Sequence, residues 1–182
     1  MTIRSYLHSS PSIASSVYVD ETALVVGDVS IGEDSSIWPM TAVRGDVQSI
    51  KIGDRTNIQD GSVLHVTSDN SLTPGGFALT IGDDVTVGHG VILHACTVGN
   101  LSLIGMGSTV LDGAVVQDNV MVGAGSLVSP GKVLESGYLY LGSPVKKTRA
   151  LKEEELEYLK FSAVHYVELK NRHMKPLGEL GL

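Results

Sequence analysis

An aliphatic side chain recurs at every sixth position over most of this 182-residue chain. The positions hold Ile13, Val19, Val25, Ile31, Ile37 and Val43, then Ile52, Ile58 and Leu64, then Ile81, Val87 and Leu93, then Val98, Ile104, Val110, Val116, Val122 and Val128. The position two residues earlier mostly holds a small or β-branched residue. This pattern fits very short strands in which two inward side chains alternate with an outward one. The repeat therefore predicts a solenoid of many short strands.

A corner must follow each of these short strands. Glycine often comes directly after the aliphatic residue, as in Ile52-Gly53, and we interpret it as the residue whose positive φ favours a bend. Three faces of six residues make one triangular coil, and stacked coils hydrogen-bond at a spacing of about 4.8 Å. We therefore expect a mainly β fold, a parallel β-helix of about six to seven triangular coils over residues 1–148, with an inserted loop at about residues 66–78.

The pattern changes near residue 151 to helix-forming residues. Leu156, Leu159 and Ala163 are three or four positions apart, which is the spacing of one helix face. This spacing predicts a C-terminal α-helix over residues 152–172 that packs on the outside of the coil, within a segment of residues 149–182.

The charge of the chain is acidic, with 13 Lys and Arg against 20 Asp and Glu and a net charge of −7. Such a surface repels phosphate backbones and anionic lipid, so we expect no nucleic acid and no membrane among the partners. The N-terminus shows no leader pattern, and no apolar run reaches the roughly 18 residues of a membrane span. The single cysteine, Cys96, cannot form an internal disulfide. Together these features predict a cytoplasmic protein.

Three histidines occupy positions on the coil that can be compared. His65 and His94 each follow the third inward aliphatic residue of successive coils, so their side chains stack on one edge about 4.8 Å apart. His89 lies two places after Val87, on another edge of the triangle. Imidazole is a good ligand for zinc and its neighbours. If the two edges meet between neighbouring subunits, a three-fold ring completes three interfacial metal sites.

Other polar residues fall on the same two edges. Arg44 and Asp46 lie on the edge of His65, whereas Gln59 and Asp60 lie on the edge of His89. Structural roles stay open for each of them: Arg44 and Asp60 pairing between subunits, Asp46 forming a turn, and Gln59 capping a corner. Cys96 occupies an inward position, where a thiol acts as a small apolar filler rather than a ligand.

These residues stand in a pattern that resembles a known family. The pattern comprises Arg44-Gly45-Asp46, Asn57-Ile58-Gln59-Asp60-Gly61, His65, His89 and His94, followed by residues 136–145. It resembles the γ-class carbonic anhydrases of the hexapeptide-repeat superfamily. The resemblance implies that the coils wind left-handed. It also implies a metal-dependent hydro-lyase that interconverts CO₂ and bicarbonate.

The resemblance further implies roles for individual residues. His65 and His94 of one subunit and His89 of the next would bind Zn²⁺, or another divalent metal such as Fe²⁺ or Co²⁺, in a homotrimer. The residues that would shape the site are Arg44, Asp46, Gln59 and Asp60, and Tyr166 lies in a region that sometimes lines it. Such an ion makes a bound water acidic enough to attack CO₂.

The sequence departs from the family pattern in the residues for proton export. Val47 stands where family members carry a glutamate, and residues 66–78 contain Asp69 but no Glu or His. We therefore expect slow proton transfer and low turnover. Two other functions stay open. One is a hexapeptide-repeat acyltransferase that acts on a coenzyme A donor with an interfacial histidine as general base. The other is a non-catalytic metal-binding trimer.

Overall fold

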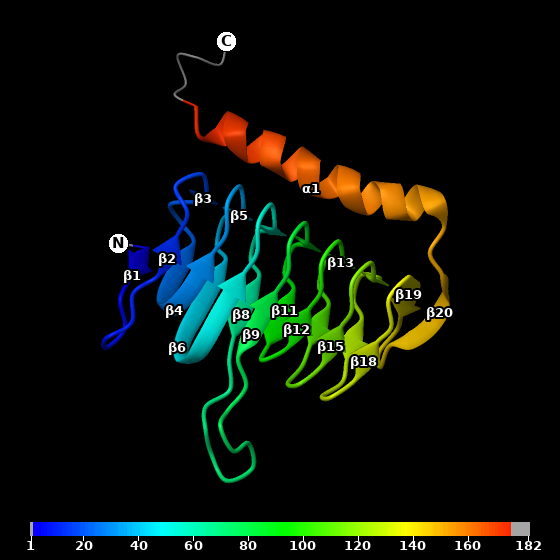
Figure 1. The fold of residues 1–182 in the computed structure, drawn as a ribbon, viewed down its shortest axis with the longest axis horizontal. Coiled ribbons are helices and arrows are strands. Elements are labelled where there is room, and N and C mark those ends of the chain that lie inside the picture. Colours follow the sequence, from blue (N-terminus) through cyan, green and yellow to red (C-terminus); the bar gives the residue numbers. More distant parts are fainter. Residues whose placement is uncertain (1, 176–182) are drawn as a thin grey trace.

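The computed structural model describes residues 2–175, which form a solenoid of about eight turns flanked by one long helix (Figure 1). In this range a larger sheet has twelve strands and a second sheet has eight. The larger sheet contains β1 (Ile3–Arg4), β2 (Ser12–Ile13), β4 (Leu24–Ile31), β6 (Ala42–Ile52), β8 (Val63–His65), β9 (Leu79–Ile81), β11 (Ile92–His94), β12 (Thr97–Val98), β14 (Thr109–Val110), β15 (Val115–Val116), β17 (Leu127–Val128) and β18 (Val133–Leu134). The second sheet contains β3 (Tyr18–Val19), β5 (Ser36–Ile37), β7 (Asn57–Ile58), β10 (Thr86–Val87), β13 (Leu103–Ile104), β16 (Met121–Val122), β19 (Tyr138–Leu141) and β20 (Lys146–Ala150).

The strands stack in three parallel rows, one for each face of the coil. One row contains β8, β11, β14 and β17, a second contains β9, β12, β15 and β18, and the smaller sheet supplies the third. The long strands β4 and β6 pass through both rows of the larger sheet and join them. Their pairing shifts register after Gly27 and Gly45, because the four residues 46–49 of β6 lie opposite the single residue Asp28 of β4, and this adds three residues to the repeat between Val43 and Ile52, a slip in the repeat. The mainly β fold is therefore confirmed.

The repeat positions form the core. Every sixth-position residue from Val25 to Val128 is buried, whereas Ile13 and Val19, in the first coil at the open end, are only partly buried. Small polar residues at the preceding inward position tie one coil to the next. For example, Ser35 Oγ donates a hydrogen bond of 2.7 Å to the carbonyl oxygen of Gly53. The repeat did not predict the opening strand β1, which pairs with β4, or the antiparallel strand β20, which pairs with β19.

The explanation given above for the glycine after each inward aliphatic residue is wrong. Gly53 does not have a positive φ; instead, a Cβ there would lie 2.2 Å from Asp83 Oδ1 and 2.6 Å from the carbonyl carbon of Gly82. The left-handed residues come two positions later, where Arg55 has a φ of 51° and Asp84 a φ of 57°. Glycine is required at position 53 because the next coil approaches too closely for any side chain.

The helix α1 (Glu153–His173) begins and ends within one residue of the expected range. It runs from the last coil back along the solenoid and lies against β3, β5 and β10 (Figure 1). Near its C-terminus the buried Lys170 donates hydrogen bonds of 2.8 Å to the Ser16 carbonyl oxygen and 2.7 Å to Asn171, and its ammonium lies 2.9 Å from Asp34. Within residues 2–175, no helix has the length and apolarity needed to cross a membrane.

Residues 66–78 form a loop that projects from the solenoid between β8 and β9 (Figure 1). Its neck is closed by two backbone hydrogen bonds between Thr67 and Phe77, of 3.0 and 2.9 Å. Gln48, in the slip of β6, reaches the loop and donates to the Gly75 carbonyl oxygen at 2.7 Å. The loop is therefore held against the edge that carries His65.

Candidate metal centre

His65 and His94 come together at the ends of two neighbouring strands. They occupy paired positions in β8 and β11, and His65 Nδ1 lies 3.2 Å from His94 Nε2. Two nitrogens bound to a tetrahedral zinc ion at about 2.0 Å each would be about 3.3 Å apart. The donor set and its spacing therefore fit a divalent cation of this kind.

Asp46 is the hydrogen-bond partner of His65, with 3.1 Å between Asp46 Oδ1 and His65 Nε2. Burial raises the pKa of Asp46, but hydrogen bonds from Arg44 and His65 outweigh burial and hold that pKa below its usual range. Burial lowers the pKa of His65, and the hydrogen bond to Asp46 offsets this only in part. His65 is therefore kept neutral, which is the form that binds metals.

Asp112, which the sequence analysis did not single out, is the partner of His94. Its Oδ1 lies 2.6 Å from His94 Nδ1, and its Oδ2 accepts a hydrogen bond from Thr67 Oγ1. Burial raises the pKa of Asp112, yet the hydrogen bonds from Thr67 and His94 lower it below its ordinary value. Asp112 lies two residues after Val110, one coil beyond His94 on the same edge, so the register that placed the histidines also locates this residue.

His89 lies on a different edge, between β10 and β11, and its Nδ1 is 2.9 Å from Asp60 Oδ2. Gln59, which is almost fully buried, donates from Nε2 to Asn57 Oδ1 at 3.0 Å. Tyr166 of α1 lines a cavity of about 420 Å³ together with Gln59 and His89. The structure therefore brings His89, Asp60, Gln59 and Tyr166 to one side of the coil.

The two groups of histidines do not meet within one chain. Among residues 2–175, no set of three or more His, Cys, Asp or Glu side chains could hold a metal ion. His65 and His94 belong to the larger sheet, whereas His89 follows a strand of the smaller sheet. Arg44 pairs with Asp46 rather than with Asp60 inside the chain. His89 is therefore separated from His65 and His94 within one chain.

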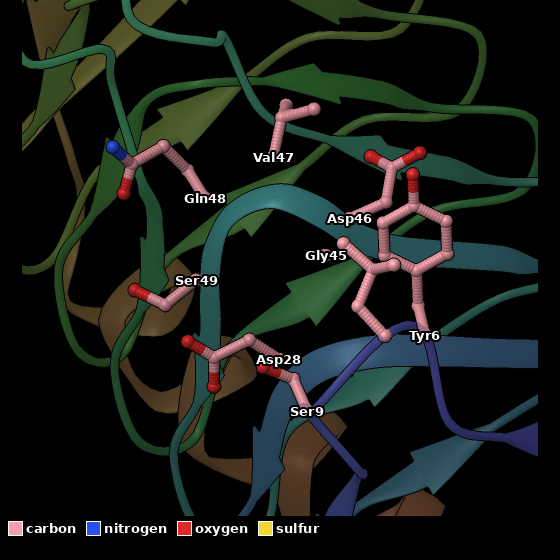
Figure 2. A pocket seen from close by; sticks show the side chains of 9 residues that line it. Tyr6, Ser9, Asp28, Gly45, Asp46, Val47, Gln48 and Ser49 are labelled. Atoms are coloured by element: carbon pink, nitrogen blue, oxygen red, sulfur yellow. The ribbon is translucent and has the colours of Figure 1, made fainter.

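A second cavity, of about 310 Å³, borders Asp46 (Figure 2). In Figure 2, Asp46 and Tyr6 lie toward one end of this cavity, and Gln48 and Ser49 lie toward the other. Val47, the position where the resemblance implies a glutamate, lines the cavity with a partly exposed aliphatic side chain. No carboxylate therefore occupies position 47 beside Asp46.

Cys96 is buried in the core, and burial raises the pKa of its thiol to about 12. A thiol with so high a pKa is protonated at neutral pH, and only the thiolate binds metals or acts as a nucleophile. The structure therefore agrees with the interpretation of Cys96 as an apolar filler.

Comparison with known proteins places the chain in a family. No family model matches it. It is 55% identical over 172 residues to protein YrdA of Escherichia coli, covering 94% of both proteins. It is 43% identical to a carbonic anhydrase of Geobacillus kaustophilus, covering 96% of this chain and 91% of that protein. It is also 42% identical to mitochondrial gamma carbonic anhydrase 2 of Arabidopsis thaliana, covering 94% of this chain and 62% of that protein.

Two solved structures also resemble the chain over almost its whole length. A hexapeptide transferase family protein from Anaplasma phagocytophilum superposes with a TM-score of 0.86 at 44% identity, covering 93% of this chain and 96% of the other. A Bacillus cereus protein described as a putative acetyltransferase superposes with a TM-score of 0.88 at 42% identity, covering 94% and 95%. The chain therefore belongs to the γ-class carbonic anhydrase-like proteins of the hexapeptide-repeat superfamily, and its fold is the left-handed parallel β-helix that this membership implies.

Proposed function

We propose that this chain forms a homotrimer whose interfacial metal centres interconvert CO₂ and bicarbonate. The observation that carries the proposal is the distribution of the three histidines between two edges of the coil. His65 and His94 present two nitrogens 3.2 Å apart on one edge, and His89 stands on another edge with its own carboxylate partner. A three-fold rotation that sets these edges against each other completes three equivalent centres.

In such a centre a divalent ion, Zn²⁺, Fe²⁺ or Co²⁺, would supply the Lewis-acid polarisation of water that CO₂ hydration needs. His65, His94 and His89 would hold it. Asp46 fixes the ring of His65, and Asp60 fixes the ring of His89. Arg44 in turn holds Asp46 ionised. These residues bind and orient, and none of them needs to change its protonation state.

Gln59 and Tyr166 are the residues we assign to the substrate. Asn57 anchors the amide of Gln59, so the amide enters the cavity beside His89 in one orientation and can donate to an oxygen of CO₂ or bicarbonate. Tyr166 lines the same cavity. Burial raises the pKa of Tyr166, and the nearby Asp60 raises it further. The phenol therefore stays protonated and serves as a hydrogen-bond donor.

Proton export is expected to limit the rate. Val47 cannot carry a proton, and residues 66–78 contain no Glu or His. A soluble buffer base then has to take the proton, so turnover should rise with buffer concentration.

The first test is His89→Ala, with metal content and CO₂ hydration measured on protein loaded with Zn²⁺, Co²⁺ or Fe²⁺. We expect a folded coil that retains almost no metal, because each of the three centres loses one ligand. His8→Ala is the matched control, since His8 is an exposed histidine in the segment between β1 and β2 and has no part in the proposed centre. Wild-type metal content in His89→Ala would refute the metal assignment.

An acyltransferase is the second candidate, because one structural neighbour is described as a putative acetyltransferase and a cavity of about 420 Å³ opens beside His89. Acetyl-coenzyme A turnover measured on the same preparations separates the two. Turnover without CO₂ hydration would favour the acyltransferase. Metal retention with neither activity would favour the non-catalytic metal-binding trimer.

A further inference from the structure

We propose that Asp112 is a positioning residue for His94, and that Thr67 holds Asp112 in the position this requires. Asp112 would keep the proton of the imidazole on Nδ1 and so leave the lone pair on Nε2, the nitrogen that faces His65. The metal-binding consequence rests on the proposed function, but the position of the proton is a property of the metal-free protein.

The first step of the argument is the chemistry of a neutral imidazole, which has one N–H donor and one lone pair. His94 Nδ1 lies 2.6 Å from Asp112 Oδ1. An ionised carboxylate only accepts hydrogen bonds, so the nitrogen that faces it has to carry the proton. The lone pair is therefore on His94 Nε2.

The same reasoning applies to the other ring of the pair. His65 Nε2 lies 3.1 Å from Asp46 Oδ1, so the proton of His65 is on Nε2 and the lone pair is on Nδ1. His65 Nδ1 and His94 Nε2 are 3.2 Å apart, and neither has a hydrogen to donate to the other. The two carboxylates thus direct two lone pairs toward one point, which is the arrangement that a cation requires.

Thr67 holds the carboxylate of Asp112 in place through a second hydrogen bond. Its Oγ1 donates to Asp112 Oδ2, the oxygen that does not contact His94. Thr67 is itself fixed by its two backbone hydrogen bonds to Phe77 at the neck of the 66–78 loop. The carboxylate of Asp112 therefore cannot rotate away from His94 without breaking the contact to Thr67.

The experiment compares Asp112→Ala and Asp112→Asn with Asp118→Ala. Asp118 is a matched control because it is also a corner aspartate, and it accepts a hydrogen bond from the Asn100 backbone away from the histidines. The first readout is the ring ¹⁵N spectrum of metal-free protein with labelled histidine, in which the His94 signals are assigned with His94→Gln. The second readout is Zn²⁺ affinity, measured by competition with a chelator.

We expect wild type and Asp118→Ala to show His94 protonated on Nδ1, and Asp112→Ala to show a mixture of the two tautomers. Zn²⁺ binding should weaken about 10- to 100-fold in Asp112→Ala, the usual effect of losing the partner of a ligating histidine. Asp112→Asn keeps an acceptor oxygen, so it should preserve the tautomer and restore part of the affinity. Thr67→Val should have a Zn²⁺ affinity, and a share of the Nδ1-protonated tautomer of His94, between those of wild type and Asp112→Ala.

An unchanged His94 tautomer in Asp112→Ala, or a wild-type His94 protonated on Nε2, would overturn the proposal. Unchanged Zn²⁺ affinity in Asp112→Ala would also overturn it. If CO₂ hydration is absent while the tautomer and the affinity respond as expected, the proposed activity fails and the role of Asp112 stands.

Discussion

At the scale of single residues, contacts between neighbouring coils decide which side chains are allowed. Gly53 lies against the backbone of Gly82 and the carboxylate of Asp83, and a Cβ would overlap both. Gly125 is the opposite case: its φ is +67°, and a Cβ there would meet nothing within 4 Å. The two glycines therefore serve different purposes, close approach at position 53 and left-handed backbone at position 125.

This difference predicts unequal costs for Gly53→Ala and Gly125→Ala. Gly125→Ala should lower the free energy of unfolding by about 1–2 kcal/mol, the cost of a left-handed non-glycine residue. Gly53→Ala should cost about 3 kcal/mol, because rigid backbone has to move apart to admit a methyl group. Urea unfolding at one protein concentration measures both. Equal losses would contradict the close-approach explanation.

The core residues could be predicted from the sequence, but the contacts of the candidate site could be predicted only in part. Periodicity assigns each residue to a face, and this was enough to place His65 beside His94. It does not give the distance between a corner and the coil above it, so the sequence did not show why position 53 requires glycine. Asp112 was missed because its role depends on a side chain that reaches back across one coil.

At the scale of elements, α1 is fastened to the coil by a buried lysine and an aromatic cluster. Lys170 contacts Ser16 and Asp34 of the first coils. Trp38 packs against Tyr166 and His173 of the helix, at ring distances of 5.7 and 5.1 Å. Helical spacing predicted the element and its limits to within one residue, but a lysine gives no sign in the sequence that it is buried. The predicted division into a β-helix over residues 1–148 and a C-terminal segment over residues 149–182 stays a prediction.

Lys170→Ala should loosen the C-terminal half of α1. Loss of the charged hydrogen bonds should lower the free energy of unfolding by about 1.5–3 kcal/mol. Trp38 is the single tryptophan of the chain, so its fluorescence reports whether the helix is docked. Lys160→Ala, at an exposed position of the same helix, is the control and should leave the emission unchanged. A spectrum of Lys170→Ala identical to wild type would show that the lysine does not fasten the helix.

At the scale of the whole molecule, the two edges of the coil carry two separate groups of histidines and carboxylates. One edge carries His65, His94 and their carboxylates, and the other carries His89 with Asp60. The sequence register predicted this separation because it depends only on counting faces. The rotation that would join neighbouring chains in the proposed trimer depends on surface shape, which a repeat does not encode.

Mixing two defective variants tests the proposed assembly. His89→Ala and His94→Ala should each fail to retain metal alone. When the two are co-refolded in equal amounts, they should recover about a quarter of the wild-type metal. The reason is that each junction joins the His65–His94 edge of one chain to the His89 edge of the next, and both edges are intact in one junction in four. His65→Ala mixed with His94→Ala should recover none, since every junction then lacks a ligand from the same edge. Metal content after gel filtration measures both mixtures. Equal recovery in the two mixtures would exclude ligands shared between chains.

The last two strands of residues 2–175 differ from the coils before them. β19 and β20 pair antiparallel, in contrast to the parallel coils before them, and β20 is exposed and carries Lys146, Lys147 and Arg149. A parallel solenoid that ended in an open edge would be a template for end-to-end polymerisation, and a reversed, cationic final strand is an effective barrier to it. On this one face of the solenoid, β20 thereby opposes end-to-end pairing with another molecule.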